Sequence, residues 1–151
     1  MLKLSKKMLF ALEAVVDIGV NARPDPVQSK EITQRQGIPK RYLEQVMQHL
    51  VRANILRGVR GPKGGYRLAR ERRRISVGEI VRVISEMELG PDEDRKNQPS
   101  NLGLTIVQPL WQELEDEMME RLDAINIEDL CRKAEQSGVA GEGRDKADFT
   151  I

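Results

Sequence analysis

Apolar residues near the start of the chain recur with the three- and four-residue steps of one helix face. The positions concerned are Met8, Leu9, Leu12, Val15, Val16 and Ile18. They predict a helix over 7–21 that stops at Asn21. A loop with two prolines follows, and Ser29 is predicted to cap a short helix that ends at Gly37 in the left-handed conformation.

The next stretch, "IPKRYLEQVMQHLVRANI" (38–55), predicts a helix with two different faces. Pro39 suits its first turn, and an apolar stripe is formed by Leu43, Val46, Met47 and Leu50. The other side carries Lys40, Arg41, Glu44, Gln45, Gln48, His49 and Arg52. Two short helices separated by "QGIP", the second with one buried and one polar-basic face, are typical of a helix-turn-helix.

A two-residue alternation then replaces the helical period on both sides of "GPKG". It predicts that residues 55–60 and 66–69 pair as a β-hairpin, which is called a wing when it follows a recognition helix. Ser76 and Glu79 stand at the spacing of a capping box, so another helix is expected to begin there.

Apolar residues are scarce in 88–101 and then return with nearly heptad spacing. Leu104, Val107, Trp111, Leu114, Met118, Leu122 and Ile125 would form one seam on a long helix, with a short helix "IEDLCRKAE" after it. A chain of this size has little apolar surface of its own on which the seam could pack. We therefore expect Val107, Trp111, Leu114, Met118 and Leu122 to pack against a second copy; the alternative is packing on their own domain.

These patterns predict a fold that is mainly α with a small β-hairpin. The expected parts are a winged helix-turn-helix domain (1–87), a linker loop (88–101), a dimerisation helix with a short C-terminal helix (102–136), and a disordered tail (137–151).

The net charge of +1 hides a strong asymmetry along the chain. Residues 1–74 carry 17 Lys or Arg against 6 Asp or Glu (+11), and residues 75–151 carry 8 against 18 (−10). A basic half joined to an acidic half favours a polyanion-binding module attached to a part that avoids the polyanion. Chance segregation of solvated charges is the alternative.

The basic, apolar start of the chain raises the question of a signal peptide. Glu13 and Asp17 interrupt the apolar run and no small-residue cleavage site follows, so we interpret it as an amphipathic helix. No apolar run is long enough to cross a bilayer, and the single cysteine, Cys131, agrees with a reducing compartment. We expect a cytoplasmic protein without membrane contact.

The sequence provides little evidence for an enzymatic site. The glycine-rich stretch 59–74 lacks the spacing of a P-loop, because Lys63 precedes Gly64 and Gly65 and no hydroxyl residue follows. The dinucleotide-binding fingerprint is also missing. His49 is the one histidine, and nothing in the sequence positions it beside Cys131. We predict no catalytic residues and no metal ligands.

DNA binding accounts for the same residues better. Arg and Lys on the polar face of 40–52 can pair with guanine, and Gln45 and Gln48 can pair with adenine. Glu44 either accepts from cytosine or orients Arg41. Arg60 and Lys63 would approach phosphates or the minor groove. For the run Arg70, Arg72, Arg73 and Arg74, phosphate contact and solvent exposure both stay open.

Three segments, with the first helix and "LW" at 110–111, carry a family resemblance: "YLEQ" at 42–45, "VRGPKGGYRLAR" at 59–70 and "ISVGEIV" at 75–81. Over about residues 1–135 the chain resembles the Rrf-type bacterial winged-helix transcription regulators (the IscR/NsrR/RirA/CymR family). The resemblance implies a homodimer, crossed through the long helix, that binds a palindromic operator on double-stranded DNA. It places Tyr42, Glu44 and Gln45 on the recognition helix and Arg60 on the wing.

The chain departs from the sensory members of that family at one place. Those members carry three cysteines between the fourth helix and the dimerisation helix as iron–sulfur ligands, whereas residues 88–104 contain none. Cluster ligation depends chiefly on thiolates, so we expect no bound cofactor. The resemblance then points to cysteine-metabolism repressors, which respond through a partner enzyme, although a small effector is also open. Cys131 is interpreted as a small buried residue, with a redox role as the alternative.

Together the patterns predict a homodimeric, sequence-specific transcription regulator, of the repressor kind, that acts on cysteine, sulfur or iron–sulfur metabolism without a cluster. Two alternatives remain: a protein-interaction module that regulates a metabolic enzyme directly, and an atypical iron–sulfur sensor with mixed ligands.

Overall fold

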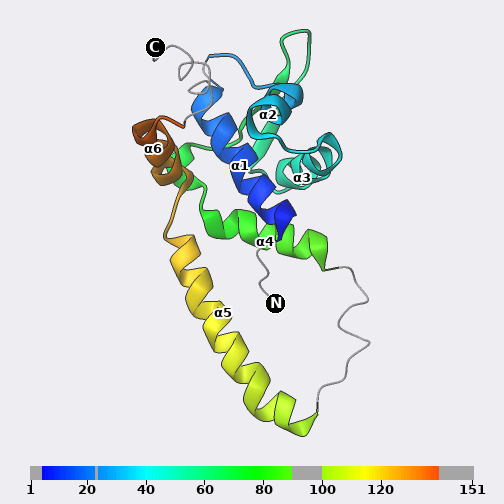
Figure 1. Ribbon diagram of the computed structural model, residues 1–151, viewed down its shortest axis with the longest axis vertical. Helices are drawn as coiled ribbons and strands as arrows, with labels where there is room; N and C mark the ends of the chain where they lie inside the picture. Colours follow the sequence, from blue (N-terminus) through cyan, green and yellow to red (C-terminus); the bar gives the residue numbers. More distant parts are fainter. Residues whose placement is uncertain (1–4, 23, 90–99, 140–151) are drawn as a thin grey trace.

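The computed structural model describes residues 5–22, 24–89 and 100–139. Helices dominate, and one two-stranded antiparallel hairpin interrupts them, so the predicted fold class is confirmed. Figure 1 shows α1 to α4, the hairpin and α6 gathered into one body, with α5 extending away from it. Predictions on residues 90–99 (the linker) and 140–151 (the tail) lie outside the described residues.

The N-terminal helices follow the sequence pattern closely. Helix α1 spans Lys6–Asn21 and α2 spans Ser29–Gln36, which ends at Gly37 with a φ of 68°. The prediction that Ser29 caps α2 is wrong by one residue. Gln28 occupies the cap because its backbone N–H donates to the Glu31 carboxylate at 2.8 Å, and this bond starts the helix at Ser29.

Helix α3 spans Lys40–Arg52 and is shorter than the predicted stretch 38–55. Its start is set by Ile38, which enters the core, and by Pro39, which takes the cap position. Its end is set by Asn54, which has a positive φ of 60° that a helix cannot continue through.

The hairpin pairs β1 (Leu56–Val59) with β2 (Gly65–Leu68), within one residue of the predicted strands. The register places Leu56 opposite Leu68 and Arg57 opposite Arg67. Val27, in the loop before α2, exchanges two backbone hydrogen bonds with Tyr66, at 3.0 and 2.7 Å. The wing is therefore attached to the helix-turn-helix along its second strand.

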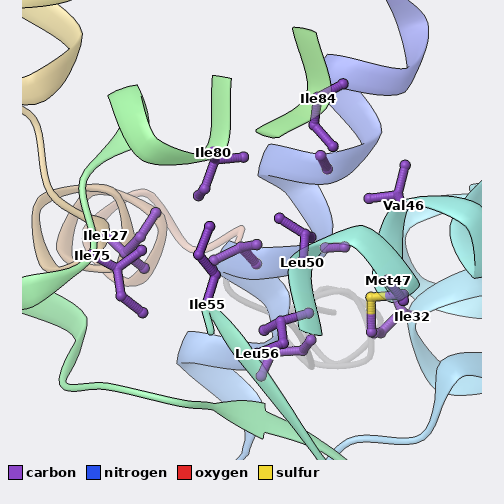
Figure 2. Close-up of a cluster of buried hydrophobic side chains, with 14 of the residues drawn as sticks. Ile32, Val46, Met47, Leu50, Ile55, Leu56, Ile75, Ile80, Ile84 and Ile127 are labelled. Atoms are coloured by element: carbon purple, nitrogen blue, oxygen red, sulfur yellow. The ribbon is translucent and has the colours of Figure 1, made fainter. Parts of the chain in front are cut away.

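One aliphatic core joins almost all elements of the body (Figure 2). The labelled side chains come from α2, α3, the hairpin, α4 (Val77–Glu88), α6 (Ile127–Ser137) and the segments beside them: Ile32, Val46, Met47, Leu50, Ile55, Leu56, Ile75, Ile80, Ile84 and Ile127. The Ser76–Glu79 capping box predicted for α4 is confirmed. Because Ile127 and Cys131 are fully buried, α6 packs into the core formed with the N-terminal helices and the hairpin.

The predicted long helix runs without a break over 101–123. It contains a π-helical turn, Gly103–Val107, which leads directly into α5 (Gln108–Asp123). Pro109 explains the wider turn, since in an α-helix its ring would clash with the carbonyl of Thr105. No helix within 5–22, 24–89 and 100–139 is long and apolar enough to span a membrane.

Candidate nucleic-acid interface

Helix α3 presents one buried and one exposed face. Leu43, Val46, Met47 and Leu50 are at most 1% exposed and fix the helix on the core. The predicted contact residues Lys40, Arg41, Tyr42, Glu44, Gln45 and Gln48 are all exposed. The same amphipathic pattern that anchors the helix therefore presents a row of cations and amides to solvent.

The ion pair of Glu44 at the start of α3 differs from the predicted alternative in which Glu44 orients Arg41. The carboxylate of Glu44 lies 3.9 Å from the Lys40 ammonium, one helical turn away. Its ion-pair partner is thus Lys40 and not Arg41. Both side chains are more than half exposed, so the pair contributes little to stability and can separate when a ligand approaches.

Tyr42 connects the start of α3 to α1. Its ring centroid lies 6.0 Å from that of Phe10, and the ammonium of Lys7 lies 5.7 Å from the Tyr42 ring centroid. Lys7 is therefore an additional cation beside the recognition face. The basic start "KLSKK" was the available signal for it, but helical spacing alone does not show which turn of α1 meets α3.

The hairpin turn requires its glycines. A Cβ on Gly64 would lie 2.3 Å from the Val59 carbonyl oxygen, and a Cβ on Gly65 would lie 2.4 Å from the Val27 carbonyl oxygen. Arg60 and Lys63 are exposed in this turn. No carboxylate in the described part of the chain pairs with either one, so both are available for phosphate or groove contact.

The arginine run at 70–74 is divided. Arg73 and Arg74 are exposed, in keeping with the expectation, whereas Arg70 and Arg72 are partly buried in ion pairs, which corrects the expectation for these two. Arg70 pairs with Glu79 at 3.0 Å. Arg72 pairs with Glu128 at 2.8 Å and Glu135 at 3.5 Å, and its side chain is 15% exposed. These ion pairs connect the segment that follows the wing to α4 through Glu79 and to α6 through Glu128 and Glu135. Arg73 pairs locally with Glu71 at 2.9 Å.

A buried carboxylate holds the two helices before α3 in place. Asp17 on α1 accepts two bonds from Arg35, at 2.9 and 2.8 Å, and one from Gln36 at 2.8 Å. The Asp17 side chain is 0% exposed. This cluster fixes the end of α2 against α1, and with it the turn that leads into α3.

Cys131 does not provide a metal site. The side chain is fully buried, and a Cβ on Gly19 would lie 2.8 Å from its Sγ atom. Burial raises the pKa of the thiol, which disfavours the thiolate that a metal requires. Among the described residues, no three His, Cys, Asp or Glu side chains are grouped as metal ligands. This donor set does not fit a cysteine-ligated cluster, and the interpretation of Cys131 as a small buried residue agrees with its position.

Comparison with known proteins gives a consistent result. The model of the Rrf2 family, described as an iron-dependent transcriptional regulator, matches residues 4–133. The HTH-type transcriptional regulator IscR of Escherichia coli is 30% identical over 140 residues, which cover 93% of this chain and 86% of that protein.

Two solved structures are also similar. The structure of IscR from T. potens is 34% identical with a TM-score of 0.72, covering 92% of this chain and 93% of the other. That of CymR, the global cysteine regulator of B. subtilis, is 30% identical with a TM-score of 0.68, covering 88% and 98%. These relatives are regulators and not enzymes, as the sequence predicted. The chain belongs to the Rrf2 family and is a DNA-binding transcriptional regulator of the IscR and CymR type.

Proposed function

We propose that the chain acts as a homodimeric, sequence-specific repressor that binds a palindromic operator in the cytoplasm. The observation that carries this proposal is the exposed polar face of α3 beside the unpaired cations of the wing. Gln45 and Gln48 would pair with adenine, and Arg41 and Lys40 with guanine. Arg60 and Lys63 would follow the adjacent phosphates or the minor groove.

The apolar face of α5 supports the dimer. Val107, Trp111, Leu114 and Met118 are between 47% and 53% exposed, and Leu104 and Leu110 extend the same surface. Contiguous apolar patches of this kind mark interaction sites on soluble proteins. A second copy of the same helix fits best because the seam repeats with heptad-like spacing. Leu122, which we also expected in the seam, packs partly against the core of its own chain.

Two apposed copies would present two recognition helices. A symmetric dimer reads two half-sites in opposite orientation, so its operator is expected to be palindromic with half-sites about one helical turn apart.

The signal is proposed to reach this regulator without a cysteine-ligated cluster. The likeness to a global cysteine regulator supports a role in cysteine, sulfur or iron–sulfur metabolism. Repression fits a dimer that occupies promoter DNA until a partner enzyme or a small effector changes its affinity.

Genome-wide mapping of bound DNA tests the proposal. We expect a limited number of sites that share one inverted repeat, upstream of genes of sulfur or cluster metabolism. Transcription of these genes should rise when Gln45 and Arg60 are both replaced by alanine. The matched control is Lys133→Ala on α6, which removes an exposed cation away from α3 and the wing. Binding without a shared repeat, or an unchanged pattern in the double variant, would exclude the proposed role.

A further inference from the structure

A second basic surface lies at the base of the wing, on the side of α1 and α6. It is a groove of about 800 Å³ between the strands of the hairpin, the last turns of α1 and the first half of α6. Arg57, Arg67, Gly19, Ala22 and Arg132 lie along its walls. We call this surface the wing-base groove.

The wing-base groove contains two uncompensated positive charges. Arg57 and Arg67 stand directly opposite each other in the hairpin register. Like charges at such positions destabilise a strand pair unless an anion lies between or beside them. No carboxylate in the described residues pairs with either one; Arg67 donates to the Pro24 carbonyl instead.

The other charges of the groove compensate one another. Arg72 and Arg132 both pair with Glu128, at 2.8 and 3.3 Å. The carboxylate of Asp129 accepts from the Asn126 backbone N–H at 3.1 Å as a helix cap. The remaining two arginines on the walls are those already paired with Glu71 and Glu79. The surplus charge is therefore concentrated on the two hairpin arginines.

The position of the groove separates it from the proposed DNA surface. Its described lining includes no residue of α2 or α3 and none of the turn 60–64. It connects the strands that carry Arg60 at their tip with α6, which follows directly after α5. A ligand held there would contact the wing and the C-terminal helix together.

We propose that the wing-base groove is a binding site for a small phosphorylated anion with at least two negative charges, held by Arg57 and Arg67. Guanidinium groups bind phosphate oxygens in bidentate fashion, and two neighbouring ones match a dianion. The volume accommodates a metabolite-sized molecule. Such a ligand would relieve the repulsion between the two strands and fix the wing relative to α6. Its consequence for transcription rests on the proposed regulatory function, whereas its binding does not.

Calorimetric titration of the full chain with inorganic pyrophosphate, at constant ionic strength and without DNA, tests the site. The wild type should bind one pyrophosphate per chain in a saturable manner. The double variant Arg57→Gln/Arg67→Gln should bind at least tenfold more weakly. The matched control Arg60→Gln/Lys63→Gln, which loses the same charge at the wing tip, should bind like the wild type. Absence of saturable binding to the wild type, or equal weakening in both double variants, would overturn the proposal.

A single variant and a competition with DNA complete the experiment. Arg57→Gln alone removes a side chain that pairs with no carboxylate among the described residues, so it should fold like the wild type and still lose several-fold in pyrophosphate affinity. A random-sequence 20-base-pair duplex tests whether the phosphates come from DNA. The groove would be a DNA contact if two results were found together: the duplex displaces pyrophosphate, and Arg57→Gln/Arg67→Gln weakens binding of the duplex as much as the wing-tip control does. The small-ligand proposal would then be wrong.

The anion site and the proposed regulatory function can fail separately. If the wild type binds pyrophosphate but no operator, the anion-site proposal stands and the proposed function is wrong.

Discussion

At the scale of single residues, Asp17 is a buried charge that requires partners inside the protein. Its carboxylate is fully buried and accepts hydrogen bonds from Arg35, Gln36 and Asn21. Replacing it with alanine leaves the Arg35 guanidinium, 17% exposed, without this partner. We expect Asp17→Ala to lower the free energy of unfolding by about 3 kcal/mol or more. Urea denaturation measures the change.

The control for Asp17 is an exposed ion pair. Glu71→Gln breaks the pair with Arg73, in which both side chains are at least 60% exposed, so the expected change is below about 0.5 kcal/mol. Similar losses in the two variants would show that the buried cluster does not hold α1 and α2 together as described.

The Cys131 thiol is expected to be inert in the native protein. It is fully buried, and burial raises its pKa, so the folded chain offers little thiolate. Labelling with a thiol reagent at pH 8 should be at least about 100-fold slower than in denaturing urea. Because the folded pKa lies above the unfolded one, the stability of the wild type should also fall as pH rises past about 8.5. Rapid labelling of the native chain would instead support the redox role.

At the scale of elements, the junction of α4 with α5 and α6 sets where α5 points. Val77 N–H donates to the Ile125 carbonyl at 2.8 Å, and Ile127 N–H donates to the Ile75 carbonyl at 2.9 Å. Beside this junction, both nitrogens of the Arg82 fork bond Asp123 at 2.7 Å. The direction of the helix that carries the proposed dimer seam is thus fixed by short contacts to α4.

Gly78 makes this close approach of α4 and α5 possible. A Cβ at this position would lie 1.9 Å from Oδ1 of Asp123 and 3.1 Å from its backbone nitrogen. Gly78→Ala should therefore displace α5 or break the Arg82–Asp123 pair, at a cost of about 1–3 kcal/mol in thermal unfolding. Gly58→Ala is the matched control, since a Cβ there meets nothing within 4 Å and no loss of stability is expected. An equally stable Gly78→Ala protein would contradict the described junction.

Local patterns of the sequence were sufficient for most elements but not for their junctions. Helices α1, α3 and α4 follow from apolar spacing, and the Ser76–Glu79 cap fixes a boundary because capping depends on neighbours in the chain. The contacts of Arg72 with Glu128 and of Gly78 with Asp123 join residues dozens of positions apart. Helical spacing carries no information on such partners, which is why the sequence alone groups Arg72 with the exposed cations.

The candidate site was predictable to the same extent. The polar face of α3 and the wing turn follow from periodicity and from glycine positions. Lys7 beside Tyr42, and the wing-base groove, depend on how α1, the hairpin and α6 pack, so they required the structure.

At the scale of the whole molecule, the proposed seam along α5 is expected to set the oligomeric state. Trp111→Glu places a charge in the centre of the proposed interface, where aromatic residues contribute most to binding. We expect the wild type to sediment at twice the chain mass of 17.2 kDa, and the variant to dissociate with a dimer constant raised at least roughly 100-fold. Glu113→Gln, an exposed position two residues along the same helix, should leave the dimer intact. A monomeric wild type would contradict the proposed dimer seam.

The proposed dimer is expected to recognise a specific sequence through α3 and the wing. The most direct measurement is the affinity of the purified chain for an operator duplex, identified by mapping or selection, and for a scrambled duplex at the same moderate salt. We expect a preference of at least about 1,000-fold for the operator, together with a steep loss of affinity as salt rises. Equal affinity for the two duplexes would contradict it.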